Sequence, residues 1–177
     1  FGPYLFPLNI LFRLIEELKI KNITVEINSI GCKNCRSSYR KKLQDYYKKA
    51  QNKICHDCKR RFTLNPLRLL DCKNELCQPI KASAPIMLDY FCSSCKNHFK
   101  NVLEYLDELN LPYTLNSHLV RGLDYYNRTV FEFFVDGYNV ALGSGGRYDY
   151  LSEIFGARPK ILPAIGAALG IERLVEV

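Results

Sequence analysis

Apolar residues recur at helical intervals near the start of the chain and alternate with polar residues shortly afterwards. Leu8, Phe12 and Ile15 fall on one face of a helical wheel, which predicts an amphipathic helix over residues 8–19. From Ile23 to Ile27 every second residue is apolar, and this pattern predicts a half-buried strand. A helix packed beside a strand is therefore expected at the start of the fold.

The middle of the chain reads mainly as helix, and the last third reads mainly as strand. Helical spacing of apolar residues predicts helices over 36–50 and 94–110, with a break at Asn65-Pro66 between them. After Pro112 the pattern changes. The elements predicted there are strands at 113–117, 130–135, 138–142 and 164–168, a glycine turn at 143–146, and helices at 148–155 and from 170 onward.

Length and composition limit the class of protein. The 177 residues suit one domain, or one domain with an insertion, and 47% are hydrophobic. The sequence has no run long enough to span a bilayer and no signal-peptide pattern, so we expect a cytoplasmic protein without a membrane partner. The beginning at Phe1 and the end at Val177, inside a helical pattern, suggest a piece of a longer protein.

Positive charge is concentrated in one segment. Residues 32–112 hold 16 Lys and Arg against 8 Asp and Glu, an excess of +8, whereas the remaining residues hold 9 and 10. Such an excess favours an anionic partner such as nucleic acid. The alternative is a solvated, lysine-rich surface with no partner.

All eight cysteines lie in the same segment and form four close pairs. CxxC turns point two sulfurs at one centre, and eight sulfurs would fill two four-cysteine zinc sites. The candidate Zn²⁺ ligands are Cys32 and Cys35, Cys55 and Cys58, Cys72 and Cys77, and Cys92 and Cys95.

Other interpretations of the cysteines remain open. Disulfides suit secreted chains, and nothing in the sequence indicates export. Free buried thiols would not need four regular pairs. His56 or His98 could replace a sulfur, and the sequence does not say which pairs share a metal. Two four-cysteine zinc sites would each contribute −2, which lowers the charge of the segment from +8 to about +4.

Charged residues interrupt an otherwise apolar stretch between residues 119 and 135. Arg121, Asp124, Arg128 and Glu132 stand where the pattern favours burial. Buried charges must be paired or must face a polar ligand. The stretch is therefore either an ion-paired strand or, given the density of charges and tyrosines, the wall of a pocket.

Three motifs in this part of the chain resemble those of one enzyme family. Arg121-Gly-Leu-Asp-Tyr-Tyr-Asn-Arg-Thr-Val-Phe-Glu132 and Gly145-Gly-Arg-Tyr-Asp149 resemble the two histidine signatures of the histidyl-tRNA synthetases. Pro163 to Leu174 resembles motif 3 of the class II aminoacyl-tRNA synthetases. Residues 27–31 and 65–71 also fit, so the resemblance covers essentially the whole chain.

The resemblance implies an architecture and a set of partners. It implies an α+β fold with part of an antiparallel class II sheet, made of residues 1–31 and 113–177, and a helical, Cys-rich insertion domain over 32–112. The insertion would contact the acceptor arm of tRNA(His), in agreement with its basic excess. The family's motif 1, which builds the homodimer, its motif 2 and its anticodon-binding domain are not found, so this piece alone is expected to be inactive.

The resemblance also implies roles for individual residues. Arg121 would be the catalytic cation and would contact ATP, which enters with Mg²⁺ as a substrate, and Arg173 would also bind ATP. The residues implied to bind histidine are Leu123, Tyr126, Gly145, Gly146 and Tyr148.

Structural roles are the alternatives for the same residues. Arg121 could pair with Asp124, and Arg173 could pair with Glu172 or Glu176. The tyrosines could be ordinary core residues, and the glycines could serve only a turn.

Two other functions compete with the ligase. One is a non-catalytic paralogue that regulates ATP phosphoribosyltransferase, although such proteins tend to lose the signature that is intact here. The other is a zinc-dependent RNA-binding module, which the cysteines and charge favour but the pocket motifs do not.

Overall fold

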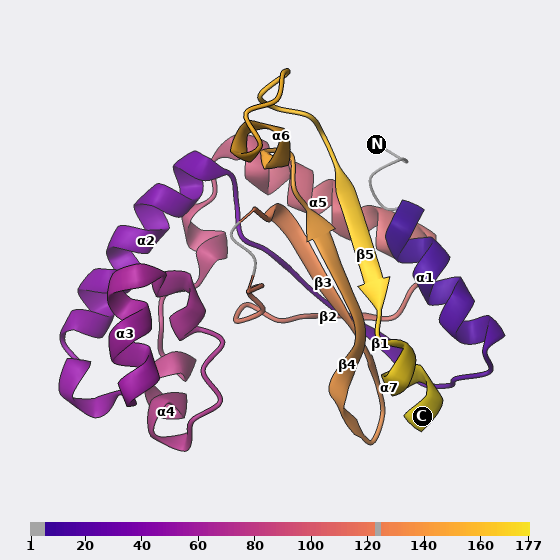
Figure 1. Cartoon of the computed structure of the whole chain (residues 1–177), viewed down its shortest axis with the longest axis horizontal. Helices are drawn as coiled ribbons and strands as arrows, with labels where there is room; N and C mark the ends of the chain where they lie inside the picture. Colours follow the sequence, from indigo (N-terminus) through magenta and orange to yellow (C-terminus); the bar gives the residue numbers. More distant parts are fainter. Residues whose placement is uncertain (1–5, 123–124) are drawn as a thin grey trace.

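The computed structural model describes residues 6–122 and 125–177 (Figure 1). The helices are α1 (Phe6–Glu17), α2 (Lys33–Lys48), α3 (His56–Leu64), α4 (Gln78–Ala82), α5 (Ser93–Glu108), α6 (Leu151–Ile154) and α7 (Ile171–Glu176). Short 3₁₀ turns are η2 (Gln51–Lys53), η3 (Pro66–Leu69), η4 (Glu75–Cys77) and η5 (Met87–Tyr90). The strands are β1 (Ile23–Ser29), β2 (Tyr113–Leu115), β3 (Asn127–Val135), β4 (Tyr138–Arg147) and β5 (Ile165–Leu169).

The five strands form one mixed sheet in the order β2-β1-β3-β4-β5. The α+β class is therefore confirmed, but the sheet is not wholly antiparallel, because β2 runs parallel to β1. The long helical segment between these two strands returns the chain to the same end of the sheet, which makes the parallel pairing possible. The pairs β1–β3, β3–β4 and β4–β5 are antiparallel, as expected.

One face of the sheet is apolar and is covered by two helices. Val25 and Ile27 on β1 are paired with Phe133 and Phe131 on β3, and all four side chains are fully buried. Helices α1 and α5 cover this face in Figure 1 and share one core with it. Burial of each such side chain contributes about 1.5–3 kcal/mol. The residues contributed by the helices are Leu8, Phe12 and Ile15 from α1 and Phe99, Val102 and Leu106 from α5.

A second core lies in the helical lobe formed by α2, α3 and α4, at the left of Figure 1. Tyr39, Leu43 and Tyr47 follow one face of α2 and are fully buried. The Tyr39 hydroxyl donates a hydrogen bond to the Pro85 carbonyl at 2.7 Å. The division into residues 1–31, 32–112 and 113–177 stays a prediction, and α5, from the middle range, adds side chains to the core under the sheet.

The glycine turn predicted at 143–146 is wrong, because all four residues lie inside β4. The strand is nearly bare of side chains there because its neighbours occupy the space. A Cβ atom on Gly143 would lie 2.3 Å from Leu169 Cδ2, and one on Gly146 would lie 2.8 Å from Tyr126 Cδ1. Glycine is thus required for close packing on both faces of a strand.

No helix in the described ranges has the length and apolar character needed to cross a membrane.

Candidate functional site

The face of the sheet opposite α1 and α5 carries a row of polar side chains. Glu26, Glu132 and Ser144 are direct neighbours across β1, β3 and β4. Side chains alternate along a strand, so this row points away from the apolar core that contains Phe131 and Phe133. The polar row defines the floor of the candidate site.

Arg121 lies over this row and is held by two strands. Its guanidinium forms an ion pair with Glu132, and its Nη2 donates a hydrogen bond to Ser144 Oγ at 2.7 Å. Its Nε is buried and has no hydrogen-bond partner among the described residues. Asp124, the partner considered in the sequence, lies outside the described residues. The arrangement leaves a directed N–H donor for a further group.

Burial raises the pKa of the Glu132 carboxyl, and the nearby Glu26 adds to this, whereas Arg121 opposes it. Arg121 thus stabilises a carboxylate that has been removed from water. The pair sets the position of the arginine.

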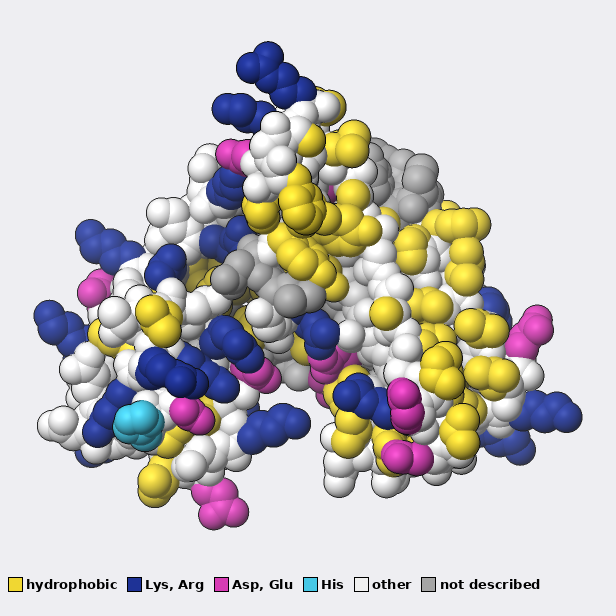
Figure 2. All heavy atoms as spheres, viewed as in Figure 1, with side chains coloured by type: hydrophobic (Ala, Val, Ile, Leu, Met, Phe, Trp, Pro, Cys, Tyr) yellow, Lys and Arg dark blue, Asp and Glu magenta, His cyan; other side chains and the backbone are white. Residues whose placement is uncertain are grey.

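Arg173 shares a cavity of about 510 Å³ with Arg121, Glu132 and Ser144. Its Nη1 donates a hydrogen bond to the Ala141 carbonyl at 2.5 Å. Glu176, one of the two acids considered as its partner, accepts a hydrogen bond from the Tyr138 hydroxyl. Figure 2 shows a hollow between the helical lobe and the strands, with basic and acidic side chains along its sides. The structure therefore brings the two predicted ATP-binding arginines to one cavity.

The predicted histidine-pocket tyrosines also lie together on the polar face. The rings of Tyr126 and Tyr148 are 6.3 Å apart, and Tyr125 joins them at 4.7 Å from Tyr126 and 5.8 Å from Tyr148. Burial raises the pKa of Tyr126 to about 12, with a further contribution from Tyr125. Its hydroxyl therefore keeps its proton at neutral pH and can donate a hydrogen bond.

Two glycines fix the positions of these rings. Gly146 lies beneath Tyr126, and a Cβ atom on Gly166 would lie 2.6 Å from the Tyr148 hydroxyl. Gly145 differs, because its Cβ position points to the core face, 2.6 Å from Phe131 Cζ. Its contact with histidine stays a prediction, and Leu123 lies outside the described residues.

Sequence reasoning missed several residues of the site. Asn127 and Asp149 are buried and joined by two hydrogen bonds, and Arg147 Nε donates to both Asp149 oxygens at 2.7 Å. Asp149 also accepts from the Ala164 amide, so it connects β4 to the approach to β5. Asp149 could have been found from its position at the end of the second histidine signature, and Tyr125 from its position next to Tyr126. Nothing in the sequence pointed to Ser144.

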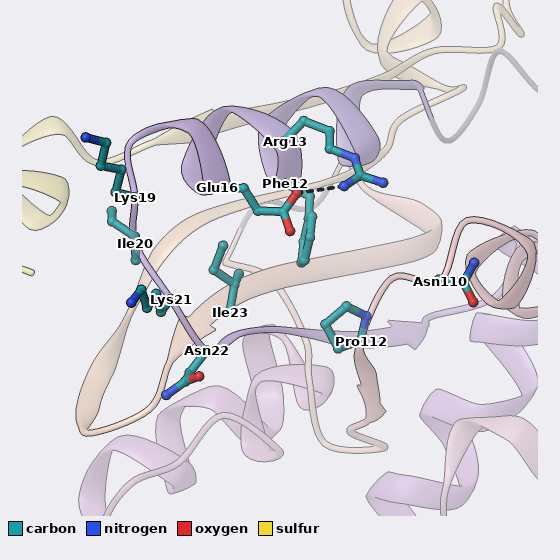
Figure 3. Close-up of a pocket in the computed structure, with 10 residues that line it drawn as sticks. All are labelled: Phe12, Arg13, Glu16, Lys19, Ile20, Lys21, Asn22, Ile23, Asn110 and Pro112. Carbon is teal, nitrogen blue, oxygen red and sulfur yellow. Dashed lines mark hydrogen bonds and ion pairs between the residues drawn. The ribbon is translucent and has the colours of Figure 1, made fainter.

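A larger hollow of about 620 Å³ lies elsewhere, between α1, the start of β1 and the loop before β2 (Figure 3). Phe12 and Ile23 form apolar parts of its wall, and an exposed Arg13–Glu16 ion pair lies at its side. None of the signature residues lines it. The size of this hollow does not by itself indicate a function.

The cysteines form two separate groups of four. In each group the four sulfur atoms lie within 4.8 Å of one another. None of the eight cysteines forms a disulfide. The first cluster is Cys32, Cys35, Cys92 and Cys95, and the second cluster is Cys55, Cys58, Cys72 and Cys77.

The geometry of both clusters fits a tetrahedral zinc ion. Bonds of about 2.3 Å from zinc to sulfur place the sulfurs about 3.8 Å apart. The measured separations are 3.6 Å for Cys32–Cys35 and 3.8 Å for both Cys55–Cys72 and Cys58–Cys77. Neither predicted histidine alternative is needed: His56 is exposed, and His98 contacts Thr129.

The surroundings favour the thiolate at the first cysteine of three pairs, whereas burial raises the pKa of Cys35, Cys58, Cys77 and Cys95. Cys32, Cys55 and Cys92 each precede the first turn of a helix, where the dipole stabilises negative charge. The backbone amide of Cys92 donates to Cys35 Sγ at 3.1 Å, and that of Cys55 donates to Cys77 Sγ at 3.3 Å.

A buried phenol next to the second cluster also lacks an acceptor. The Tyr47 hydroxyl has no hydrogen-bond partner among the described residues. Cys58 and Cys77 lie close enough to add to the effect of burial in raising its pKa. The sulfurs of Cys58 and Cys77 thus lie near this phenol without accepting a hydrogen bond from it.

The family model for histidyl-tRNA synthetase matches residues 63–174. The mixed sheet with its flanking helices makes this an α+β protein, with two arginines in one cavity and a tyrosine cluster on the polar face of the sheet. The chain belongs to the histidyl-tRNA synthetase family.

Individual relatives agree with the family match. The chain is 46% identical over 163 residues to a histidine–tRNA ligase of Clostridium novyi and 48% identical over 165 residues to one of Thermodesulfovibrio yellowstonii. It covers 38% and 39% of their lengths, and each match covers 92% of this chain. The crystal structure of apo histidyl-tRNA synthetase from S. aureus matches with a TM-score of 0.72 and 32% identity, over 96% of this chain and 41% of that one.

Proposed function

We propose that this chain supplies part of the active site of a histidine–tRNA ligase. The full-length enzyme would join histidine and ATP into histidyl-adenylate, release pyrophosphate, and transfer the histidyl group to tRNA(His). The observation that carries the proposal is the placement of Arg121, Arg173 and the tyrosine cluster around the polar face of one sheet. The high identity to curated ligases supports it.

Arg121 suits the first chemical step. The histidine carboxylate must approach the α-phosphate of ATP, and both groups are negatively charged. A fixed cation lowers that repulsion and stabilises the charge that develops in the transition state. Arg121 is anchored through Glu132 and Ser144, so its guanidinium is already positioned at the cavity before an oxyanion binds.

Arg173 would act on ATP from the other side of the same cavity. Its anchor is a backbone carbonyl rather than an acid, so its positive charge is not neutralised by that contact. ATP would enter with Mg²⁺, which shields the phosphates when it is bound. The chain's own contribution is to hold the nucleotide and its α-phosphate between two guanidinium groups.

The tyrosines would recognise the imidazole of histidine. The Tyr126 hydroxyl remains protonated and can exchange a hydrogen bond with a ring nitrogen, and the Tyr148 ring can form a wall. Gly146 and Gly166 leave the space that both rings occupy. Leu123 and Gly145 complete the predicted histidine-binding set.

The cysteine clusters would hold two structural Zn²⁺ ions. The sulfur separations and the amide donors support this. The ions would cross-link the starts of α2 and α5, and α3 with the turns around η3 and η4, and would take no part in chemistry.

The basic excess of residues 32–112 supports contact with the acceptor arm of tRNA(His). Figure 2 shows many of its Lys and Arg side chains on the exposed surface of the helical lobe. A homodimer and a cytoplasmic location complete the proposal for the full-length protein.

The test is histidine-dependent exchange between ATP and pyrophosphate in the full-length protein. The Arg121→Ala variant should lose exchange by at least about 100-fold, since one removed transition-state donor costs that much. Arg13→Ala is the matched control, because this arginine is exposed and paired only with Glu16 on α1. A folded wild-type protein without exchange would overturn the ligase and favour a regulatory role. Equal loss in both variants would remove Arg121 from the chemistry.

A further inference from the structure

The first cysteine cluster lies where two helices leave the sheet. Strand β1 ends at Ser29, and Cys32 and Cys35 follow at the start of α2. Cys92 and Cys95 lie at the start of α5, the helix that runs back under the sheet. Four sulfurs from two distant parts of the chain therefore meet at the edge of the candidate site.

The connection from β1 to α2 is bonded directly to the first histidine signature. The Ile30 amide donates to the Arg128 carbonyl at 2.7 Å, and the Arg128 amide donates to the Gly31 carbonyl at 2.9 Å. Arg36, which follows Cys35, donates from Nη1 to the Tyr126 carbonyl at 2.8 Å. The backbone of the histidine-pocket tyrosine is thus held by a side chain adjacent to a cluster ligand.

Helix α5 reaches the same segment from the other pair of cysteines. His98 lies three residues after Cys95, and its Nε2 is 3.3 Å from Thr129 Oγ1. Thr129 is buried on β3, three residues after Tyr126. Each half of the first cluster therefore has one side-chain contact with residues 126–129.

The junction has no space in which to shift. Gly31 has a φ of 65°, and a Cβ atom there would lie 2.4 Å from Met87 Cε and 2.8 Å from Cys35 Cβ. Because these atoms are closely packed, a displacement of one helix start is passed on to the residues that it contacts. A change in the separation of the two helix starts would move the segment that they hold.

The second cluster has different connections. Its sulfur contacts join residues between 55 and 77 only, and they link α3 to the turns around η3 and η4. Among the described residues, those sulfur contacts include none with residues 126–129. Asp71 and Lys73, on either side of Cys72, line the cavity that holds Arg121 and Arg173, so the second cluster lies beside the arginines. Among the described residues, the contacts with residues 126–129 given above come from neighbours of the first cluster.

We propose that a zinc ion in the first cluster positions the histidine pocket by fixing Arg36 and His98 against residues 126–129. The inference rests on the proposed ligase activity, and it assigns different roles to the two cysteine clusters. Loss of the first ion should weaken histidine binding more than ATP binding, because Arg36 and His98 contact residues 126–129, whereas Arg173, which is proposed to bind ATP, lies on α7. Loss of the second ion should leave histidine binding intact.

The experiment compares two single substitutions in the full-length protein. Cys92→Ser removes an exposed ligand of the first cluster, and Cys55→Ser removes a half-buried ligand of the second. Metal content is measured by atomic spectroscopy, and the KM for histidine and for ATP by pyrophosphate exchange. Isothermal titration with histidine gives binding without turnover.

Each variant is expected to hold one zinc fewer than the wild-type protein. Cys92→Ser should raise the KM and Kd for histidine at least about tenfold, the lower end for lost support of a site, with the KM for ATP changed less than about twofold. Cys55→Ser should keep the KM and Kd for histidine within about twofold. Cys92→His should keep the ion, because three sulfurs and an imidazole also bind zinc, and should restore the histidine affinity.

The Arg36→Ala variant tests the same contact without changing a cysteine, in case the cysteine variants misfold. It should raise the histidine KM while both ions are retained, and adding Cys92→Ser should produce little further change. If the first ion were lost and the affinity for histidine stayed unchanged, the inference would be wrong but the proposed ligase activity would stand. A wild-type protein that contains no zinc would have the same meaning. Absence of exchange in a zinc-loaded wild-type protein would instead refute the ligase.

Discussion

Replacing Gly146 with alanine adds one methyl group beneath the ring of Tyr126. The new Cβ would lie 2.8 Å from Tyr126 Cδ1 and 2.9 Å from the Thr129 carbonyl oxygen. Ordinary contacts between carbon atoms are about 3.5–4.0 Å, so the ring must move by about 0.7–1.2 Å. The backbone of β4 cannot easily take up this change, because β4 is paired with β3 on one edge and β5 on the other and its other face lies against Phe131.

The expected effect follows from that displacement. Tyr126 is 7% exposed and is packed against Tyr125 and Tyr148, so its ring has no empty space to enter. A misplacement of about 1 Å in a binding site can cost up to about 100-fold. We expect the KM for histidine to rise about 10- to 100-fold, together with about 1–3 kcal/mol of lost stability from overpacking.

The assay is pyrophosphate exchange at varied histidine and ATP, with urea unfolding as the measure of stability. Gly143→Ala is the control, since its Cβ would meet Leu169 Cδ2 at 2.3 Å on the core face of the same strand. That variant should be destabilised without a selective rise in the histidine KM. If both variants changed histidine and ATP kinetics equally, Tyr126 would not be a wall of the histidine pocket.

One further prediction concerns the pH dependence of stability. Burial lowers the pKa of His98 to about 4, and the nearby Arg147 and Arg128 add to this effect. Below pH 6.5 the unfolded chain therefore binds a proton that the folded chain does not. The free energy of unfolding should decrease as the pH is lowered from 6.5 to 4. Urea titrations of His98→Gln should show a shallower fall, and an unchanged slope would remove His98 as its cause.

Periodicity located most elements of the fold to within a few residues. The helix predicted at 36–50 is α2 (Lys33–Lys48), and the one predicted at 94–110 is α5 (Ser93–Glu108). These predictions succeeded because long amphipathic patterns depend on local spacing alone. The glycines of β4 misled the analysis, because their cause is the side chains of neighbouring strands rather than a bend in their own.

The partners of the site residues could not be predicted from the sequence. The sequence offered Asp124, three residues away, as an alternative partner for Arg121 but gave no sign of Glu132 on β3 and Ser144 on β4, which Arg121 contacts in the structure. Those contacts depend on strand register, which the sequence does not display. The same limit applied to the cysteines: the pairs were visible, but their grouping required the fold.

The short span of the second cluster has a consequence for the order in which the chain can fold during synthesis. All its ligands lie between residues 55 and 77, so it can close once Cys77 has left the ribosome. At that moment β1 has no partner, since β2 begins at Tyr113 and β3 at Asn127. The helical lobe can therefore adopt a structure cross-linked by a metal ion before the strands of the sheet have been synthesised. The first cluster can bind its ion only after Cys95 has been synthesised.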